Sequence, residues 1–217
     1  KRADTDSAHP DNQRSHFLSY TDRTSTFGKC CDHRGVSNFS GYMTWGNHPA
    51  VSEILQKKSE QTGKEIRVIL SHFIPTISGI CRRFRAKRFT RGKNTFRYTK
   101  TGTVIEEDTW FQDGDVWLHL FPIPSSHAKG SLALEVDETW CFLGDAAYAT
   151  QKNGQTVYNA ERLLAEIRVL KNVRAPHFFL SHSEPFQQNK EDVLEWMEAI
   201  YEKRKRDESY IKTPQRL

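Results

Sequence analysis

The chain has 217 residues, of which 36% are hydrophobic and 27% charged, and its net charge is +5. A chain of this length can bury one substantial core, and because it contains no run of 18 apolar residues, we expect neither a membrane-spanning helix nor a membrane partner. The first thirty residues lack the apolar core of a signal peptide. The four cysteines contain no CxxC pair, so reduced thiols and a cytoplasmic location are expected.

The first part of the chain divides into a polar arm and the start of a layered domain. Residues 1–35 are rich in Ser, Thr, Asp, Asn and Arg without hydrophobic periodicity, which predicts an N-terminal arm. Residues 36–217 are interpreted as one domain. This domain is predicted to begin with a strand, a helix and a second strand, over Phe39–Trp45, Pro49–Thr62 and Glu65–Ser71. Such alternation is typical of an α/β fold.

A strongly basic segment follows, at about residues 82–100. Nine Lys or Arg and no acidic residue lie in it, with four aromatic residues between them. Basic side chains beside aromatic rings can bind phosphates and stack on bases, so a nucleic acid is one candidate partner. The residues predicted to make this contact are Arg82, Arg83, Arg85, Lys87 and Arg88. The alternative is a solvated insertion whose charge is balanced by the acidic residues 106–108.

Strands and helices alternate through the rest of the chain. Strands are predicted over Thr103–Ile105, Val116–Phe121, Ser131–Val136, Trp140–Leu143 and His177–Leu180, and helices over about Gln155–Leu170 and Lys190–Arg206. His119 alternates with Leu118 and Leu120 along its strand, so we expect a packing residue on the opposite face. His177 begins a strand and is expected to be exposed.

Three of the apolar runs end in a small residue followed by a side chain that can bind a metal ion. Ser71-His72, Gly144-Asp145 and Ser181-His182 each follow a predicted strand. Ligands of layered α/β folds collect beyond the carboxyl ends of the strands. We therefore expect these three strand ends to share one site.

Five fragments of the chain occur in a recognisable order: Ile66–His72, Asp113-Gly114-Asp115, Ser126-His127 with Gly130-Ser131, Gly144-Asp145 and Leu180-Ser181-His182. In this order and spacing the chain resembles the metallo-β-lactamase fold superfamily. The resemblance implies an α/β protein built as a four-layer αββα sandwich. It also implies a metal site lined by His72, His127, Asp145 and His182, in which Asp145 takes the position that bridges two metal ions.

The first histidine motif departs from the family pattern H-x-H-x-D-H. Ile74, Thr76 and Ile77 stand where that pattern has its second histidine, its aspartate and its third histidine. Isoleucine has no lone pair, so the resemblance implies a reduced site with one ion on His72, His127 and Asp145. The ion is most simply zinc, with iron or manganese as alternatives. With His182 included the ligand set would be closed and structural, and with too few ligands the pocket would be empty.

Two functions follow from this interpretation. In the first, the protein is a hydrolase in which a metal-activated water attacks a small-molecule ester, lactone, thioester or amide, with Asp145 and His182 as catalytic residues. In the second, it is an inactive member of the same fold that binds a ligand or nucleic acid through its pocket or basic segment. The sequence contains no G-x-S-x-G elbow and no glycine-rich phosphate loop that would indicate another chemistry.

Overall fold

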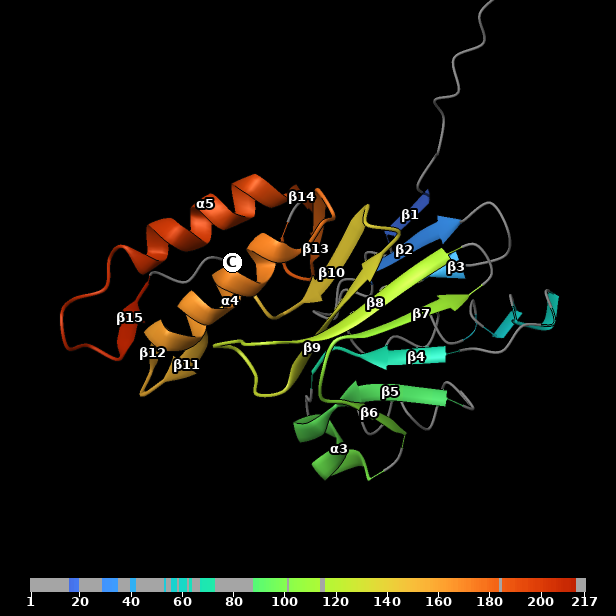
Figure 1. Ribbon diagram of the computed structural model, residues 1–217, viewed down its shortest axis with the longest axis horizontal. Helices are drawn as coiled ribbons and strands as arrows, with labels where there is room; N and C mark the ends of the chain where they lie inside the picture. Colours follow the sequence, from blue (N-terminus) through green and yellow to red (C-terminus); the bar gives the residue numbers. More distant parts are fainter. Residues whose placement is uncertain are drawn as a thin grey trace, which may run out of the picture.

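Figure 1 shows the computed structural model, which describes residues 16–19, 29–34, 40–41, 53, 56–57, 59–61, 63, 67–72, 88–100, 102–113, 116–183 and 185–213. Its largest sheet has six strands in the order β14-β13-β10-β9-β8-β7. These are β7 Thr109–Asp113, β8 Val116–Ile123, β9 Ser131–Val136, β10 Trp140–Gly144, β13 His177–Leu180 and β14 Gln187–Asn189. Within this sheet β10 and β13 run parallel and the other neighbours antiparallel.

A second sheet packs against one face of the first. It consists of β4 Arg67–Leu70, β5 Arg88–Gly92 and β6 Thr103–Ile105, which are parallel to one another. Ile105, Leu120 and Leu132 form the apolar contact that joins β6 to β8 and β9. Helix α3, Lys93–Thr99, follows β5 and lies beside this sheet (Figure 1).

The opposite face of the six-stranded sheet is covered by helices α4, Ala160–Asn172, and α5, Lys190–Tyr201 (Figure 1). Leu163 and Leu170 of α4 and Met197 of α5 pack fully buried against sheet residues such as Cys141 and Phe178. Burial of this apolar surface is the main stabilising contribution of the layer. The chain therefore folds as the predicted αββα sandwich.

Two small antiparallel sheets complete the described elements. The first contains β1 His16–Ser19, β2 Lys29–Arg34 and β3 Ser40–Gly41, so two of its strands lie inside the predicted arm. The second contains β11 Thr150–Lys152, β12 Gln155–Asn159 and β15 Tyr210–Lys212. Of the helix expected over Pro49–Thr62, the described residues 53, 56–57 and 59–61 are helical, and the others lie outside the described part. No helix in the described residues is long and apolar enough to span a membrane.

The predicted helix from Gln155 is wrong in its first five residues. Gln155–Asn159 is strand β12, and helix α4 begins at Ala160. Thr156, Val157 and Tyr158 are β-branched or aromatic, which favours a strand. The side chain of Asn159 then accepts a hydrogen bond from the backbone N–H of Arg162, so Asn159 is the N-cap of the helix.

Three further expectations need correction. Helix α5 ends at Tyr201 rather than Arg206, because its apolar stripe ends there and an exposed polar run follows. Strand β7 was not predicted. His177 is half-buried rather than exposed. In the basic segment, residues 88–92 form β5 and residues 93–99 form α3. Arg91 is 0% exposed, whereas Lys93, Arg97 and Lys100 are exposed, and Lys93 pairs with Glu106 at 3.2 Å.

His119 is a packing residue, as predicted. Its Nδ1 atom lies 3.0 Å from Oε2 of Glu135, and its ring stacks on Trp110 with centroids 3.9 Å apart. The other oxygen of Glu135 accepts hydrogen bonds from the backbone N–H groups of Arg174 and Ala175, at 2.8 and 2.7 Å. This buried carboxylate thus fixes the loop that leads into β13, and its acceptors are satisfied.

Glu166 on α4 provides a test of this core. It is 0% exposed, and neither carboxylate oxygen has a hydrogen-bond partner in the described residues. Burial raises the pKa of Glu166 well above its usual value. The contribution of Glu166 to stability is therefore fully present below its unfolded pKa and is lost as the pH rises toward the folded one.

We expect Glu166→Met to raise Tm by about 3 °C or more at pH 8, because the cost of the buried polar group disappears. The gain at pH 5 should be smaller. Thermal unfolding followed by circular dichroism at both pH values measures this difference. As a control, Glu195→Met makes the same substitution at an exposed position of α5 and should change Tm little. A gain that is equal at both pH values would contradict the argument.

Candidate metal centre

The carboxyl ends of three strands meet at one place, as the sequence predicts. His72 follows the end of β4, Asp145 follows β10, and His182 follows β13. Two backbone hydrogen bonds fix these ends to the six-stranded sheet: the N–H of Leu132, in β9, donates to the carbonyl of Ser71 at 2.7 Å, and the N–H of Ser181 donates to the carbonyl of Gly144, in β10, at 3.2 Å. The site therefore rests on the sheet scaffold.

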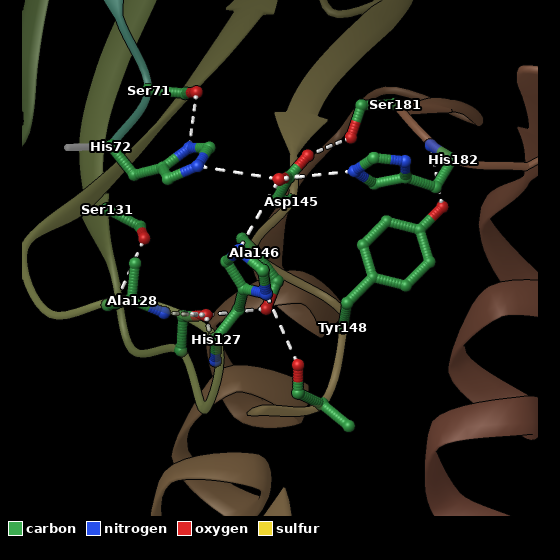
Figure 2. Close-up of polar contacts among 12 residues, drawn as sticks. Ser71, His72, His127, Ala128, Ser131, Asp145, Ala146, Tyr148, Ser181 and His182 are labelled. Atoms are coloured by element: carbon green, nitrogen blue, oxygen red, sulfur yellow. Dashed lines mark hydrogen bonds and ion pairs between the residues drawn. The ribbon is translucent and has the colours of Figure 1, made fainter. Parts of the chain in front are cut away.

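The side chains of three histidines and of Ser181 converge on the carboxylate of Asp145 (Figure 2). The Nε2 atoms of His72, His127 and His182 lie 3.4, 3.4 and 3.3 Å from Oδ2 of Asp145. The potential ligand atoms of His72, His127 and Asp145 all lie within 4.8 Å of one another. These three residues form a group that can hold a metal ion, and we call them the triad.

The hydrogen bonds around the triad fit a metal ligand set. His127 Nδ1 lies 3.2 Å from the carbonyl oxygen of Ala149, which can only accept, so Nδ1 carries the proton and Nε2 has a free lone pair. His72 Nδ1 lies 3.1 Å from the Ser71 hydroxyl. His72 Nε2 is buried and has no hydrogen-bond partner in the described residues. A buried nitrogen of this kind, beside a carboxylate, is what a bound cation would satisfy.

The electrostatics also favour a cation. Burial alone would raise the pKa of Asp145, but hydrogen bonds from His182 and Ser181 and the nearby His72 and His182 lower it to about 2. Burial lowers the pKa of His72, against the opposing effect of Asp145. At neutral pH the triad therefore presents an ionised carboxylate and a neutral imidazole, which are the forms that bind metals.

His182 occupies a different position from the other two histidines. Figure 2 shows His72 and His182 on opposite sides of Asp145. The side chain of His182 is 35% exposed, compared with 8% for His72. Its backbone N–H donates to the hydroxyl of Tyr148 at 3.0 Å, and the two rings meet edge to face. His182 thus contacts Asp145 as predicted, but it lies outside the triad.

Ser125 positions the loop that carries His127, and sequence reasoning missed it. Its hydroxyl donates to the carbonyl of Ala146 at 2.7 Å and accepts from the N–H of His127 at 3.0 Å. Ala146, which follows Asp145, and the candidate ligand His127 are therefore held by one buried hydroxyl. A serine two residues before a histidine is too common a pattern to have indicated this.

Other predicted residues lie outside the described part of the chain. This holds for Ile74, Thr76 and Ile77 of the altered motif and for Arg82, Arg83, Arg85 and Lys87 of the basic segment. Arg88 begins β5. The nucleic-acid contact remains a prediction.

Comparison with solved structures identifies the fold. A metallo-β-lactamase from Pontibacter korlensis matches with a TM-score of 0.58 and 15% identity, over 88% of this chain and 94% of that one. A flavodiiron protein from Giardia intestinalis matches with a TM-score of 0.61 and 11% identity, over 90% of this chain and 60% of that one. A flavo di-iron protein from Thermotoga maritima matches with a TM-score of 0.58 and 10% identity, over 90% of this chain and 64% of that one.

The chain has the metallo-β-lactamase fold. It spans about two thirds or less of the length of the flavodiiron chains that it matches. No protein-family model matches the sequence, and neither does any curated protein. Within the metallo-β-lactamase fold, the meeting of His72, His127 and Asp145 agrees with the site that the sequence resemblance implies.

The geometry predicts which residues retain metal. Loaded with zinc and then dialysed, the protein should hold about one ion per chain. His127→Ala and Asp145→Ala should each weaken binding at least about 100-fold, since changes to supporting residues alone cost about 10–100-fold. His182→Ala should keep the ion. Elemental mass spectrometry with a competing chelator measures this.

His177→Ala is the control, because His177 begins β13 and lies at the opposite end of that strand from His182. It should bind zinc as the unchanged protein does. If His182→Ala lost zinc as completely as His127→Ala, the site would have four protein ligands rather than three.

Proposed function

We propose that the protein is a metal-dependent hydrolase with a one-metal site. The observation that carries this proposal is the triad, two imidazoles and one carboxylate within 4.8 Å. Three protein ligands with a fourth position left for water are typical of catalytic zinc sites. Zinc is our first choice, with iron or manganese as alternatives, because nitrogen and carboxylate ligands accept all three.

A single ion favours hydrolysis over the chemistry of the flavodiiron neighbours. Those proteins are named for two irons. In the described part of this chain, one group of residues can hold a metal ion. One ion is enough for hydrolysis at a carbonyl carbon, and the Pontibacter korlensis neighbour is a metallo-β-lactamase. We infer that the substrate is an ester, lactone, thioester or amide.

Each residue of the site has a defined task in this proposal. When bound, the ion would lower the pKa of water and polarise the substrate carbonyl. Ser181 donates to Oδ1 of Asp145, which leaves Oδ2 directed at the three histidines. Asp145 stays ionised because its pKa is held at about 2. His182 is exposed enough to orient the substrate or a water at the open side of the carboxylate.

The proposal is tested by turnover of a panel of simple esters, thioesters, lactones and amides. Removing the metal with a chelator should abolish hydrolysis, and adding zinc back should restore it. Asp145→Asn should reduce kcat/KM by more than about 100-fold, because it removes the charged ligand while keeping its shape. Asp207→Asn makes the same chemical change at an exposed turn and should have no effect.

Hydrolysis that survives both chelation and Asp145→Asn would exclude the metal mechanism. A protein that binds zinc at the triad yet hydrolyses none of the panel would support the alternative. In that case it is an inactive member of the fold that binds its ligand, or a nucleic acid, without turnover.

A further inference from the structure

A cavity of about 330 Å³ lies on the loop that carries His127. Its wall includes Ser125, Ala128 and Lys129, the neighbours of that histidine. The remaining lining residues are Asn94, Ile123, Pro124, Gly130 and Arg162. The cavity thus joins three parts of the fold: the histidine loop, the first turn of α3 and the first turn of α4.

Two positively charged side chains, Lys129 and Arg162, line this cavity. Lys129 is exposed and Arg162 is half-buried. Arg162 donates from Nη1 to the carbonyl of Ser125 at 3.3 Å. In the described part of the chain no carboxylate lies within ion-pair distance of either side chain, and no acidic residue lines the cavity. A partly buried guanidinium with no counterion among the described residues favours an anionic ligand.

The walls of the cavity are held by close packing. Gly130 has a φ of +71°, and a Cβ there would lie 2.9 Å from Cβ of Asn94. A Cβ on Gly92 would lie 2.2 Å from the carbonyl oxygen of Gly130. Residues larger than glycine are therefore excluded where α3 meets the loop. This packing fixes the backbone of the loop against α3, while Arg162 is held by its hydrogen bond to Ser125.

We propose that this cavity binds a phosphate group of the substrate. This inference rests on the proposed function, since it names the part of the substrate that does not react. A phosphate monoester carries about −1.5 to −2 charges near neutral pH, which the two positive charges of Lys129 and Arg162 match. Arginine binds its oxygens in a bidentate manner, and Lys129 and Asn94 add further donors. A carboxylate, with one charge, matches less well.

The shared loop connects this subsite with the chemistry. Ser125 fixes both the backbone of His127 and, through the carbonyl of Ala146, the segment after Asp145. A phosphate anchored at Lys129 and Arg162 is therefore held against the same loop that presents the metal ligand. The proposed substrate is a small phosphorylated ester, thioester, lactone or amide.

The first test measures binding of inorganic phosphate to chelator-treated protein by isothermal titration calorimetry. Removing metal excludes phosphate binding to an ion at the triad. Lys129→Gln should weaken binding about two- to fivefold, as expected for an exposed ion pair. Arg162→Gln should weaken it about tenfold, because the lost hydrogen bond involves a charged group. Thermal unfolding checks that each variant folds.

Lys203→Gln is the matched control, since it makes the same charge change on an exposed residue after α5. It should leave binding unchanged. Acetate should bind at least about tenfold more weakly than phosphate, consistent with its single charge. Unchanged phosphate binding in Lys129→Gln, equal binding of acetate, or no phosphate binding would overturn the proposal. If Arg162→Gln does not fold, Lys129→Gln and its control decide.

A failure of the phosphate subsite can be distinguished experimentally from a failure of the proposed hydrolase function. Phosphate binding is measured without metal and without turnover. The protein can therefore bind phosphate and hydrolyse none of the panel, or hydrolyse the panel and bind no phosphate. In an active enzyme, Lys129→Gln should raise KM for phosphorylated members of the substrate panel and leave kcat near its original value. An equal effect on unphosphorylated substrates would contradict a phosphate subsite.

Discussion

The site depends on one buried carboxylate. Asp145 is 5% exposed, and its Oδ2 atom faces three imidazole nitrogens at 3.3 to 3.4 Å. A carboxylate buried to this degree is costly unless it is paired and hydrogen-bonded. Ser181 and His182 supply hydrogen bonds, and the resulting pKa of about 2 shows that these interactions outweigh burial. The surrounding residues are thus arranged around a fixed negative charge.

Close approach of two strand ends makes this arrangement possible. Gly144 precedes Asp145 and has a φ of +57°, and a Cβ there would lie 2.8 Å from the Ser71 hydroxyl. Glycine is therefore required on both conformational and steric grounds. The same close approach brings His72, the residue after Ser71, to Asp145. The glycine before the carboxylate is part of the site because it lets two sheets meet there.

Much of this site could be predicted from the sequence because strand ends are local features. The apolar runs before His72, Asp145 and His182 and the small residues that stop them can be recognised without a fold. His127 lies on a loop with no such signal, and it was found only through the order of the superfamily motifs. The difference between His182 and the triad could not be predicted, since it depends on which side of Asp145 each ring approaches.

The errors in the predicted fold also arise from contacts between residues that are distant in the sequence. Gln155–Asn159 has strand propensity but is too short to show a periodicity that separates it from the following helix, and besides its neighbour β11 it pairs with β15, more than fifty positions away. Glu135, Glu166 and Arg91 are charged residues that a sequence pattern assigns to the surface, yet each is at most 2% exposed. Their burial is decided by tertiary packing, which local propensity does not contain.

The loop from Ser125 to Ser131 links the cavity to the metal triad. Its start is fixed to Ala146 by the Ser125 hydroxyl, and its end, Ser131, is the first residue of β9 and donates from its hydroxyl to the carbonyl of Ala128 within the loop. Arg162 adds a hydrogen bond to the carbonyl of Ser125 from α4. A loop held at both ends cannot move its histidine without moving the cavity wall. In the proposed function, the phosphate subsite and His127 share this loop, so the separation between the subsite and the triad would select substrates by length.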